Sequence, residues 1–281
     1  MTSDDRDPLV PDEQGSRSSH VAAPKKHRRF GVLQEAVLLV VVALVIAVAI
    51  KQFFVQAYYI PSESMEPGLQ VNDRILVEKP SYWFSGTPQR GDVVVFSDPG
   101  GWLTAQESAG PSSPIAKGLA KIGLYPAGGH LVKRVIGVGG DTVHCCTTNG
   151  RLTVNGTAID ESSFVNHSGT GADGYGGCDG PEHQDGGAYS DGGCNGWTAT
   201  VPAGHLFVMG DNRNDSADSS YHLCSPPRLA KARSDPAVAA TCADAYVPTS
   251  DVVGKVVALM WPASRMKLIH RPSVFATVPN P

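Results

Sequence analysis

Ser64 and Lys133 are the two side chains of this sequence that could together hydrolyse an amide bond. Ser64 lies in the run Ile-Pro-Ser-Glu-Ser-Met-Glu-Pro at 60–67, and Lys133 lies in Leu-Val-Lys-Arg-Val-Ile-Gly at 131–137. A serine hydroxyl needs a base before it can attack an amide, and a lysine can be that base if burial removes its proton. Because no better-arranged Ser-His-Asp set is visible, the sequence predicts serine–lysine hydrolysis.

The lysine can act as a base only if its pKa is far below the ordinary value. A lysine with a pKa of about 10.4 is only about 0.1% neutral at pH 7.4. Burial disfavours the charged ammonium and is the available cause of a lower pKa. The neighbours Leu131, Val132, Val135 and Ile136 are apolar and surround Lys133 as they would on a buried strand.

Length and composition set the class of protein. The chain has 281 residues, of which 41% are hydrophobic, with 31 glycines and 21 prolines. This leaves room for one large domain or two small ones plus appendages, and it favours turns and short strands over long helices. The formal net charge of −4 argues mildly against nucleic acid as a partner.

An apolar run near the N-terminus predicts a transmembrane helix over residues 31–56. Residues 36–50 contain no polar side chain, and residues 1–30 are polar enough to be a disordered tail. A helix over residues 32–55 would be roughly 36 Å long, enough to cross a hydrocarbon core of about 30 Å. A buried core helix is the weaker alternative because the run is apolar on every face.

The charges beside this run predict its orientation. The basic cluster at 25–29 precedes the run and few cations follow it, which places the N-terminus in the cytoplasm and the chain after about residue 56 outside. No second run of membrane length follows, so we expect a single-pass anchor in the cell membrane. A cleaved signal peptide is the competing interpretation, because residues 47–49 read Ala-Val-Ala; the long, partly acidic tail before the run weighs against it.

The sequence after the apolar run predicts a mainly β protein. Short apolar segments bounded by turn residues predict strands at 74–78, 91–96, 131–138, 151–154, 206–209 and 252–260. No alternation of strands with helices is present, so we expect an antiparallel β-sheet catalytic domain over residues 57–270 and a C-terminal tail over 271–281. Two Gly-rich segments, about 98–129 and 166–197, are expected to be surface insertions.

All six cysteines follow the apolar run, which agrees with an oxidising compartment. They are Cys145, Cys146, Cys178, Cys194, Cys224 and Cys242. Six cysteines allow fifteen pairings, and the local spacings favour Cys178–Cys194 and Cys224–Cys242. No Cys-x-x-Cys or His-x-x-x-His spacing is present, so we predict no metal and no cofactor.

Four segments together resemble the type I signal peptidases, membrane-anchored serine proteases that remove signal peptides from exported proteins. They are a nucleophile segment at 61–67, a strand at 72–77, a lysine segment at 133–141 and a Gly-Asp-Asn-Arg segment at 210–219. All four occur in the family's order behind one N-terminal apolar run, which makes the resemblance specific. It covers about residues 30 to 265, apart from the two Gly-rich insertions.

The resemblance implies a mechanism. Ser64 would attack the scissile carbonyl and form an acyl-enzyme, while Lys133 would take the serine proton and return it to the leaving amine. The backbone N–H of Ser64 and the hydroxyl of Ser62 would stabilise the oxyanion, and Ser216 would hydrogen-bond and orient Lys133.

Around this centre the resemblance implies Asp211, Arg213 and Asp218 as supporting residues, with Arg134 as an ion-pair partner. Four positions depart from the family's pattern, and two of them are Gly68, where a threonine is frequent, and Gly139, which replaces the usual proline of the lysine segment. Asn72 stands where glycine is frequent, and Ser220 stands where many members carry an arginine that could pair with Asp218.

The implied substrates are pre-proteins whose signal peptides end in small residues, typically Ala-x-Ala. The expected partners are these pre-proteins, the lipid bilayer and the secretion translocon. Two other functions stay open: a repressor-type serine–lysine protease that cleaves itself, and a catalytically inactive, membrane-anchored binding protein.

Overall fold

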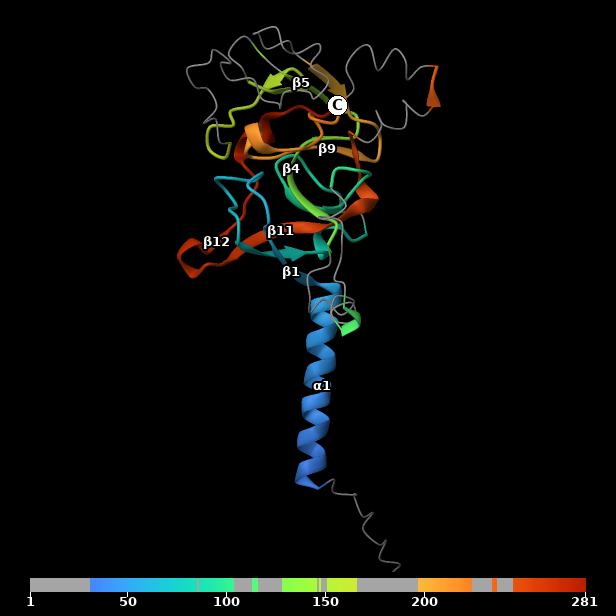
Figure 1. Ribbon diagram of the computed structural model, residues 1–281, viewed down its shortest axis with the longest axis vertical. Coiled ribbons are helices and arrows are strands. Elements are labelled where there is room, and N and C mark those ends of the chain that lie inside the picture. Colours follow the sequence, from blue (N-terminus) through green and yellow to red (C-terminus); the bar gives the residue numbers. More distant parts are fainter. Residues whose placement is uncertain are drawn as a thin grey trace, which may run out of the picture. The chain divides into compact units, whose positions relative to one another are not determined.

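The computed structural model describes residues 31–84, 86–103, 113–115, 128–145, 147, 151–165, 197–223, 234–236 and 245–281 (Figure 1). By its internal contacts the chain divides into two units, Met1–Ala43 and Leu44–Pro281. The tail expected over residues 1–30 lies outside the described residues.

Helix α1 (Val32–Phe53) is the apolar helix that the sequence predicts. Within the described ranges it contains the one segment, Val32–Ile50, that is long and apolar enough to cross a membrane. Its large side chains are exposed to solvent rather than packed in a core, so the buried-helix alternative finds no support. The helix ends before residue 56 because Val55 already pairs with Glu78 in a strand.

The larger sheet is antiparallel and has the strand order β1-β2-β11-β3-β4-β9-β10, with β12 paired to β11. The strand bounds are β1 Val55–Tyr59, β2 Arg74–Glu78, β3 Val93–Ser97, β4 His130–Val138, β9 His205–Met209, β10 Val247–Pro248, β11 Val252–Trp261 and β12 Lys267–Leu268. The first four residues of β3 are all buried, which is why this central strand is a continuous apolar run in the sequence.

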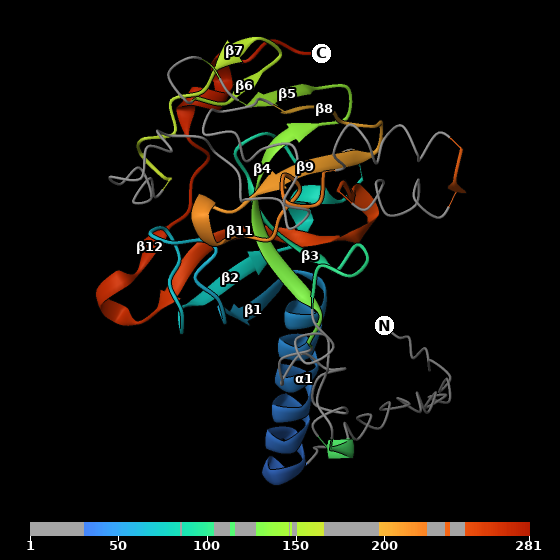
Figure 2. The same cartoon turned by 45° about the horizontal axis from the view of Figure 1, so that its top comes forward.

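A smaller antiparallel sheet has the order β7-β6-β5-β8. Its strands are β5 Thr142–Cys145, β6 Thr153–Val154, β7 Thr157–Ala158 and β8 Trp197–Thr200. Figure 2 shows this sheet beyond one end of β4 and β9. Together the two sheets confirm the predicted mainly antiparallel β fold, and the six predicted strands are present with ends that agree within two residues.

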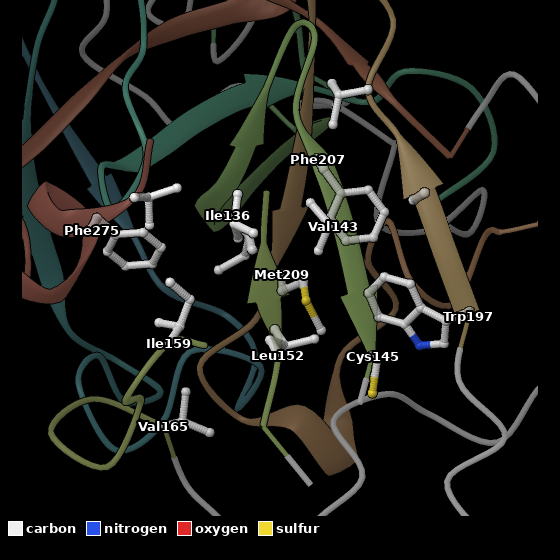
Figure 3. Close-up of a cluster of buried hydrophobic side chains, with 14 of the residues drawn as sticks. Ile136, Val143, Cys145, Leu152, Ile159, Val165, Trp197, Phe207, Met209 and Phe275 are labelled. Atoms are coloured by element: carbon white, nitrogen blue, oxygen red, sulfur yellow. The ribbon is translucent and has the colours of Figure 1, made fainter. Parts of the chain in front are cut away.

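Short 3₁₀ helices complete the described elements: η1 Pro80–Tyr82, η2 Arg213–Asp215, η3 Thr249–Asp251, η4 Ala263–Arg265 and η5 Ser273–Thr277. One buried cluster contains residues of both sheets, among them Ile136 of β4, Met209 of β9 and Val143 of β5 (Figure 3). Phe275 of η5 joins the same cluster and is only 4% exposed. The segment expected to be a C-terminal tail is therefore part of the folded core.

Most of the two Gly-rich insertions lies outside the described residues. At their described ends, Trp102 packs edge-on against Phe96, and Trp197 belongs to β8 and is buried. Cys145 of β5 is disulfide-bonded. The other five cysteines lie outside the described residues, and so do the expected pairs Cys178–Cys194 and Cys224–Cys242.

Candidate active site

Ser64 lies in the turn-rich connection between β1 and β2, which buried apolar side chains hold in place. Met65 and Leu69 are 1% and 2% exposed, and the Leu69 N–H donates to the Met65 carbonyl over 2.9 Å. The connection closes where the Asn72 N–H donates to the Ile60 carbonyl over 3.0 Å. The nucleophile candidate is thus fixed by its own neighbours in the chain.

Asn72 has a φ of +75°, in the left-handed region. Asparagine tolerates this conformation better than most residues with a side chain. The conformation gives a physical reason why a glycine is frequent at this position and why asparagine can replace it. The Asn72 side chain gains a further contact here, since the Tyr59 hydroxyl donates to its Oδ1 over 2.6 Å.

The structure brings Ser64 and Lys133 together. Lys133 lies in β4, opposite Val94 of β3, and its Nζ donates to Ser64 Oγ over 2.6 Å. Lys133 is 4% exposed and Ser64 is 8% exposed. A buried amine and a hydroxyl in direct contact are what a lysine base and a serine nucleophile require.

Burial lowers the pKa of Lys133 from 10.5 to about 8. Three nearby carboxylates, Asp218, Asp211 and Asp215, act in the opposite direction and favour the ammonium. The lowering by burial wins, so a larger share of this amine is neutral at pH 7.4 than of an ordinary lysine. This is the direction that the apolar neighbours of the lysine predict.

Ser62 is close enough to act at the same centre. Its Oγ lies 3.3 Å from Ser64 Oγ, and Ser62 is exposed to solvent. Asn212, which was not singled out from the sequence, ties this segment to the Gly-Asp-Asn-Arg loop. Its N–H donates to the Ser64 carbonyl over 3.1 Å, and its Nδ2 donates to the Glu63 carbonyl over 3.2 Å.

Gly210 packs directly against the backbone of the nucleophile. A Cβ at this position would overlap both the Ser64 carbonyl oxygen and Ser216 Oγ. The close approach of the two loops therefore requires a residue without a side chain at 210.

Asp218 is fully buried and organises the far side of this loop through four hydrogen bonds. Its Oδ2 accepts from the Gly210 N–H (2.9 Å) and the Ser216 hydroxyl (2.7 Å). Its Oδ1 accepts from the N–H (3.0 Å) and the hydroxyl (2.7 Å) of Ser220. Among the described residues no hydrogen bond joins Ser216 to Lys133, so the orientation of Lys133 by Ser216 stays a prediction.

Ser220 takes over the contact with Asp218 that an arginine at this position could make. Its two hydrogen bonds satisfy the oxygen of Asp218 that faces away from Ser216. Neutral donors therefore hold the carboxylate here, in the place where an arginine could have paired with it.

Arg134 and Asp211 form a buried, bidentate ion pair next to Lys133. Arg134 Nε lies 2.8 Å from Asp211 Oδ1, and Nη2 lies 2.6 Å from Oδ2. The third nitrogen of Arg134 donates to the Gly91 carbonyl over 3.0 Å, and its Cζ lies 4.5 Å above the ring of Phe164. The pair joins β4 to the Gly-Asp-Asn-Arg loop in a geometry that only arginine can make.

Arg213 makes a second buried ion pair, with Glu161. Its Nη2 lies 2.5 Å from Glu161 Oε1, and its Nε donates to the Gly210 carbonyl over 3.0 Å. Glu161 belongs to this constellation but was missed from the sequence. An isolated glutamate 52 positions away from its partner carries no local signal.

Within the ranges that the structure describes, no three His, Cys, Asp or Glu side chains are grouped so that they could hold a metal ion. The groups that could do chemistry on a substrate are the Ser64 hydroxyl, the Lys133 amine and the nearby Ser62 hydroxyl. Such a set can transfer an acyl group from an amide to serine and then to water.

Comparisons with known proteins place the chain in one family. Residues 33–261 match the family described as signal peptidase, peptidase S26. The chain is 38% identical over 259 residues to the probable signal peptidase I of Mycobacterium leprae, covering 87% of this chain and 81% of the relative. It is 36% identical over 279 residues to the signal peptidase I of Mycobacterium tuberculosis, covering 95% and 85%.

A solved structure of a signal peptidase I from Enterococcus faecalis is 21% identical to this chain. The match covers 60% of this chain and 96% of that one, with a TM-score of 0.31. The family match spans the helix, both loops of the candidate site and the strand β4 between them. On that match and the two mycobacterial relatives, this chain belongs to the signal peptidase family, peptidase S26.

Proposed function

We propose that Ser64 is the nucleophile and Lys133 the general base with which this chain cuts its substrates. Family membership makes the chain a signal peptidase I, a serine peptidase that removes signal peptides from secreted precursors. The 2.6 Å contact between Lys133 Nζ and Ser64 Oγ carries the assignment. A general base needs reach and a suitable pKa, and a buried lysine with a pKa of about 8 has both.

The reaction follows from this contact. Neutral Lys133 takes the hydroxyl proton while Ser64 Oγ adds to the scissile carbonyl. The resulting ammonium gives the proton to the leaving amide nitrogen, the C–N bond breaks, and an ester on Ser64 remains. Lys133, neutral again, takes a proton from water; the water oxygen adds to the ester carbonyl, and Ser64 leaves with the proton.

The oxyanion formed in each step needs hydrogen-bond donors. The Ser64 N–H and the Ser62 hydroxyl are the candidates, and the 3.3 Å separation of the two serine oxygens supports the second. Loss of one such donor typically lowers kcat by about 10²- to 10³-fold. Gly210 and Asn212 contact the nucleophile segment, and Asp218 holds Gly210 in place. The Arg134–Asp211 and Arg213–Glu161 pairs hold the loop that carries these residues.

The substrates we propose are pre-proteins whose signal peptides end in Ala-x-Ala. An extended peptide could add to the strands near Ser64 by main-chain hydrogen bonds, with small side chains against the apolar surface. The natural test is cleavage in detergent of a pre-protein with an Ala-x-Ala site, with the cut located by mass spectrometry. A cut after the second alanine supports the proposal, and replacement of that alanine by a large side chain should abolish it.

The same assay separates the other functions. Cleavage of the chain itself without cleavage of the pre-protein would favour a repressor-type protease. Absence of any cut, under varied lipid and pH, would favour a binding protein.

Gly210 offers a test of the loop geometry. Gly210→Ala should lower kcat by about 10²-fold, because the new methyl must displace the Ser64 carbonyl or Ser216, and a displacement of about 1 Å is worth that much. Steady-state kinetics on the same pre-protein measures it. Gly68→Ala is the matched control, since a Cβ there meets Asp211 Oδ2 at an ordinary 3.4 Å. Equal kcat values in the two variants would contradict the packing argument.

We also propose that α1 is a membrane anchor with the N-terminus in the cytoplasm and the catalytic part outside. Its apolar length and the basic cluster at 25–29 support this orientation. A protease added to intact spheroplasts should digest a C-terminal tag and leave an N-terminal tag protected. The reverse pattern would overturn the orientation, and loss of the N-terminal tag from the mature protein would favour a cleaved signal peptide.

Contact with the secretion translocon is a further proposal that cross-linking during export would test.

A further inference from the structure

The last residues of the chain form an element that we call the C-terminal strap, Arg271 to Pro279. It lies beyond the family match, which ends at residue 261. Phe275 and Val278 are only 4% and 7% exposed and belong to the cluster that joins the two sheets. In Figure 3 Phe275 lies at the side of this cluster near Ile136 and Ile159.

Polar contacts fasten the strap along its length. At its start, Arg271 Nη2 lies 2.9 Å from Asp92 Oδ1, a buried carboxylate that also pairs with Lys255 at 3.0 Å. Near its end, Arg90 Nη1 donates to the Val278 carbonyl over 3.3 Å, and Asn155 Nδ2 donates to the Pro279 carbonyl over 2.9 Å. These contacts tie the strap to the turn before β3 and to the turn between β6 and β7.

The strap packs against Gly91, the glycine whose carbonyl accepts a hydrogen bond from Arg134. Gly91 has a φ of +85°, and a Cβ there would lie 2.6 Å from Arg271 Cγ and 2.7 Å from Phe275 Cδ2. Its carbonyl accepts the hydrogen bond from Arg134 Nη1 at 3.0 Å. Gly91 is therefore in contact with the strap on one side and with the guanidinium on the other.

Phe275 is also linked to Arg134 through the ring of Phe164. The Phe275 and Phe164 rings pack with their centroids 6.0 Å apart, and Arg134 Cζ lies 4.5 Å above Phe164. Phe275 therefore packs against both groups that Arg134 contacts, the Gly91 backbone and the Phe164 ring.

We propose that Phe275 is a positioning residue, through which the C-terminal strap holds the Arg134 guanidinium on Asp211 behind the Ser64–Lys133 pair. The inference rests on the proposed catalytic roles of Ser64 and Lys133. It makes signal-peptide cleavage depend on a segment outside the part of the chain that matches the family.

The expected consequence is electrostatic. Asp211, Asp215 and Asp218 all favour the protonated form of Lys133, and Arg134 offsets the first of them. The other charged groups near this loop, Glu161 and Arg213, form an ion pair with each other. If loss of the Phe275 ring lets the guanidinium leave Asp211, Lys133 keeps its proton to higher pH. Cleavage then slows, and the acid limb of the kcat–pH profile moves to higher pH.

The test compares Phe275→Ala and Phe275→Leu with Phe207→Leu in the full-length protein. Phe207 is a matched control because it is buried in the same cluster, on the opposite side from Phe275 in Figure 3. kcat and KM for an Ala-x-Ala pre-protein are measured from pH 6 to 10, below the melting temperature of every variant.

We expect Phe275→Ala to lower kcat at pH 7 by about 3- to 30-fold, with KM changed less than about 2-fold and the acid limb moved upward. Phe275→Leu should show a smaller change in the same direction. If the alanine variant does not fold, the kcat and the acid limb of Phe275→Leu test the positioning role. Phe207→Leu should lower the melting temperature and leave the acid limb in place. If both positions give the same kcat and the same limb, the strap is only structural. A wild type that does not cleave would overturn the catalytic assignment itself, and this proposal with it.

Discussion

Ser64→Ala is expected to lower kcat for pre-protein cleavage by about 10⁴-fold or more. The reason is that the variant loses the oxygen that Lys133 Nζ contacts at 2.6 Å and with it the acyl-enzyme route. Binding of the signal peptide should persist, so KM or a directly measured Kd should change little. Residual cleavage, if present, would come from the oxyanion donors and the bound geometry alone.

Two controls separate loss of the nucleophile from loss of the fold. The hydroxyl of Ser64 is small and its replacement leaves no sizeable cavity, so the melting temperature should stay within a few degrees of wild type. Ser62→Ala removes the neighbouring hydroxyl and should lower kcat by only about 10²- to 10³-fold. Cleavage by Ser64→Ala at more than about 1% of the wild-type rate would remove Ser64 from the mechanism.

The residues that could be predicted from the sequence are those whose signal is local. Lys133 was expected on a buried strand from its apolar neighbours, and β4 with Lys133 4% exposed confirms that expectation. The strand at 74–78 was bounded by its own turn residues and has the predicted ends. The resemblance added the pairing of Arg134 with an acidic partner, which the structure identifies as Asp211.

What could not be predicted depends on contacts between distant segments. Strands β6 and β7 have two residues each, so they exist only through pairing with β5 and with each other. Glu161 meets Arg213 only because the segment after β7 reaches the active-site loop. Phe275 stands in a short, Pro-rich C-terminal segment with no strand or helix pattern, and only the fold shows that its ring fills a core.

Lys133→Met is expected to lower kcat by about 10⁴-fold or more, close to the effect of Ser64→Ala. Nucleophile and base act as a unit, so removal of either one removes most of the gain from both. Methionine keeps the length and apolar character of the buried stem and removes only the amine. Lys133→Arg, which keeps the charge, is the informative control: it should be equally inactive because a guanidinium is not deprotonated in proteins. Activity retained in either variant would assign the base to another group.

The wild-type pH profile should report the same lysine. With the pKa of Lys133 near 8, kcat should fall about tenfold for each pH unit below that value and level off above it. The measurement is kcat against pH on the Ala-x-Ala pre-protein, in buffers of constant ionic strength. An acid limb near pH 6 or below would point to a different base.

Lys133 should also make the protein less stable at neutral pH, and the sign follows from its lowered pKa. Between about pH 8 and 10.5 the unfolded chain carries the lysine proton and the folded chain does not, so the free energy of unfolding rises with pH across that window. Below pH 8 both states are protonated, and the folded state bears the cost of a buried ammonium, about 3 kcal/mol. Lys133→Met should therefore raise the melting temperature at pH 7 and remove the rise between pH 8 and 10.5. A variant that is less stable than wild type at pH 7 would contradict the cost assigned to the buried ammonium. A variant that is inactive and more stable would mean that burial of this lysine is maintained for catalysis at the expense of stability.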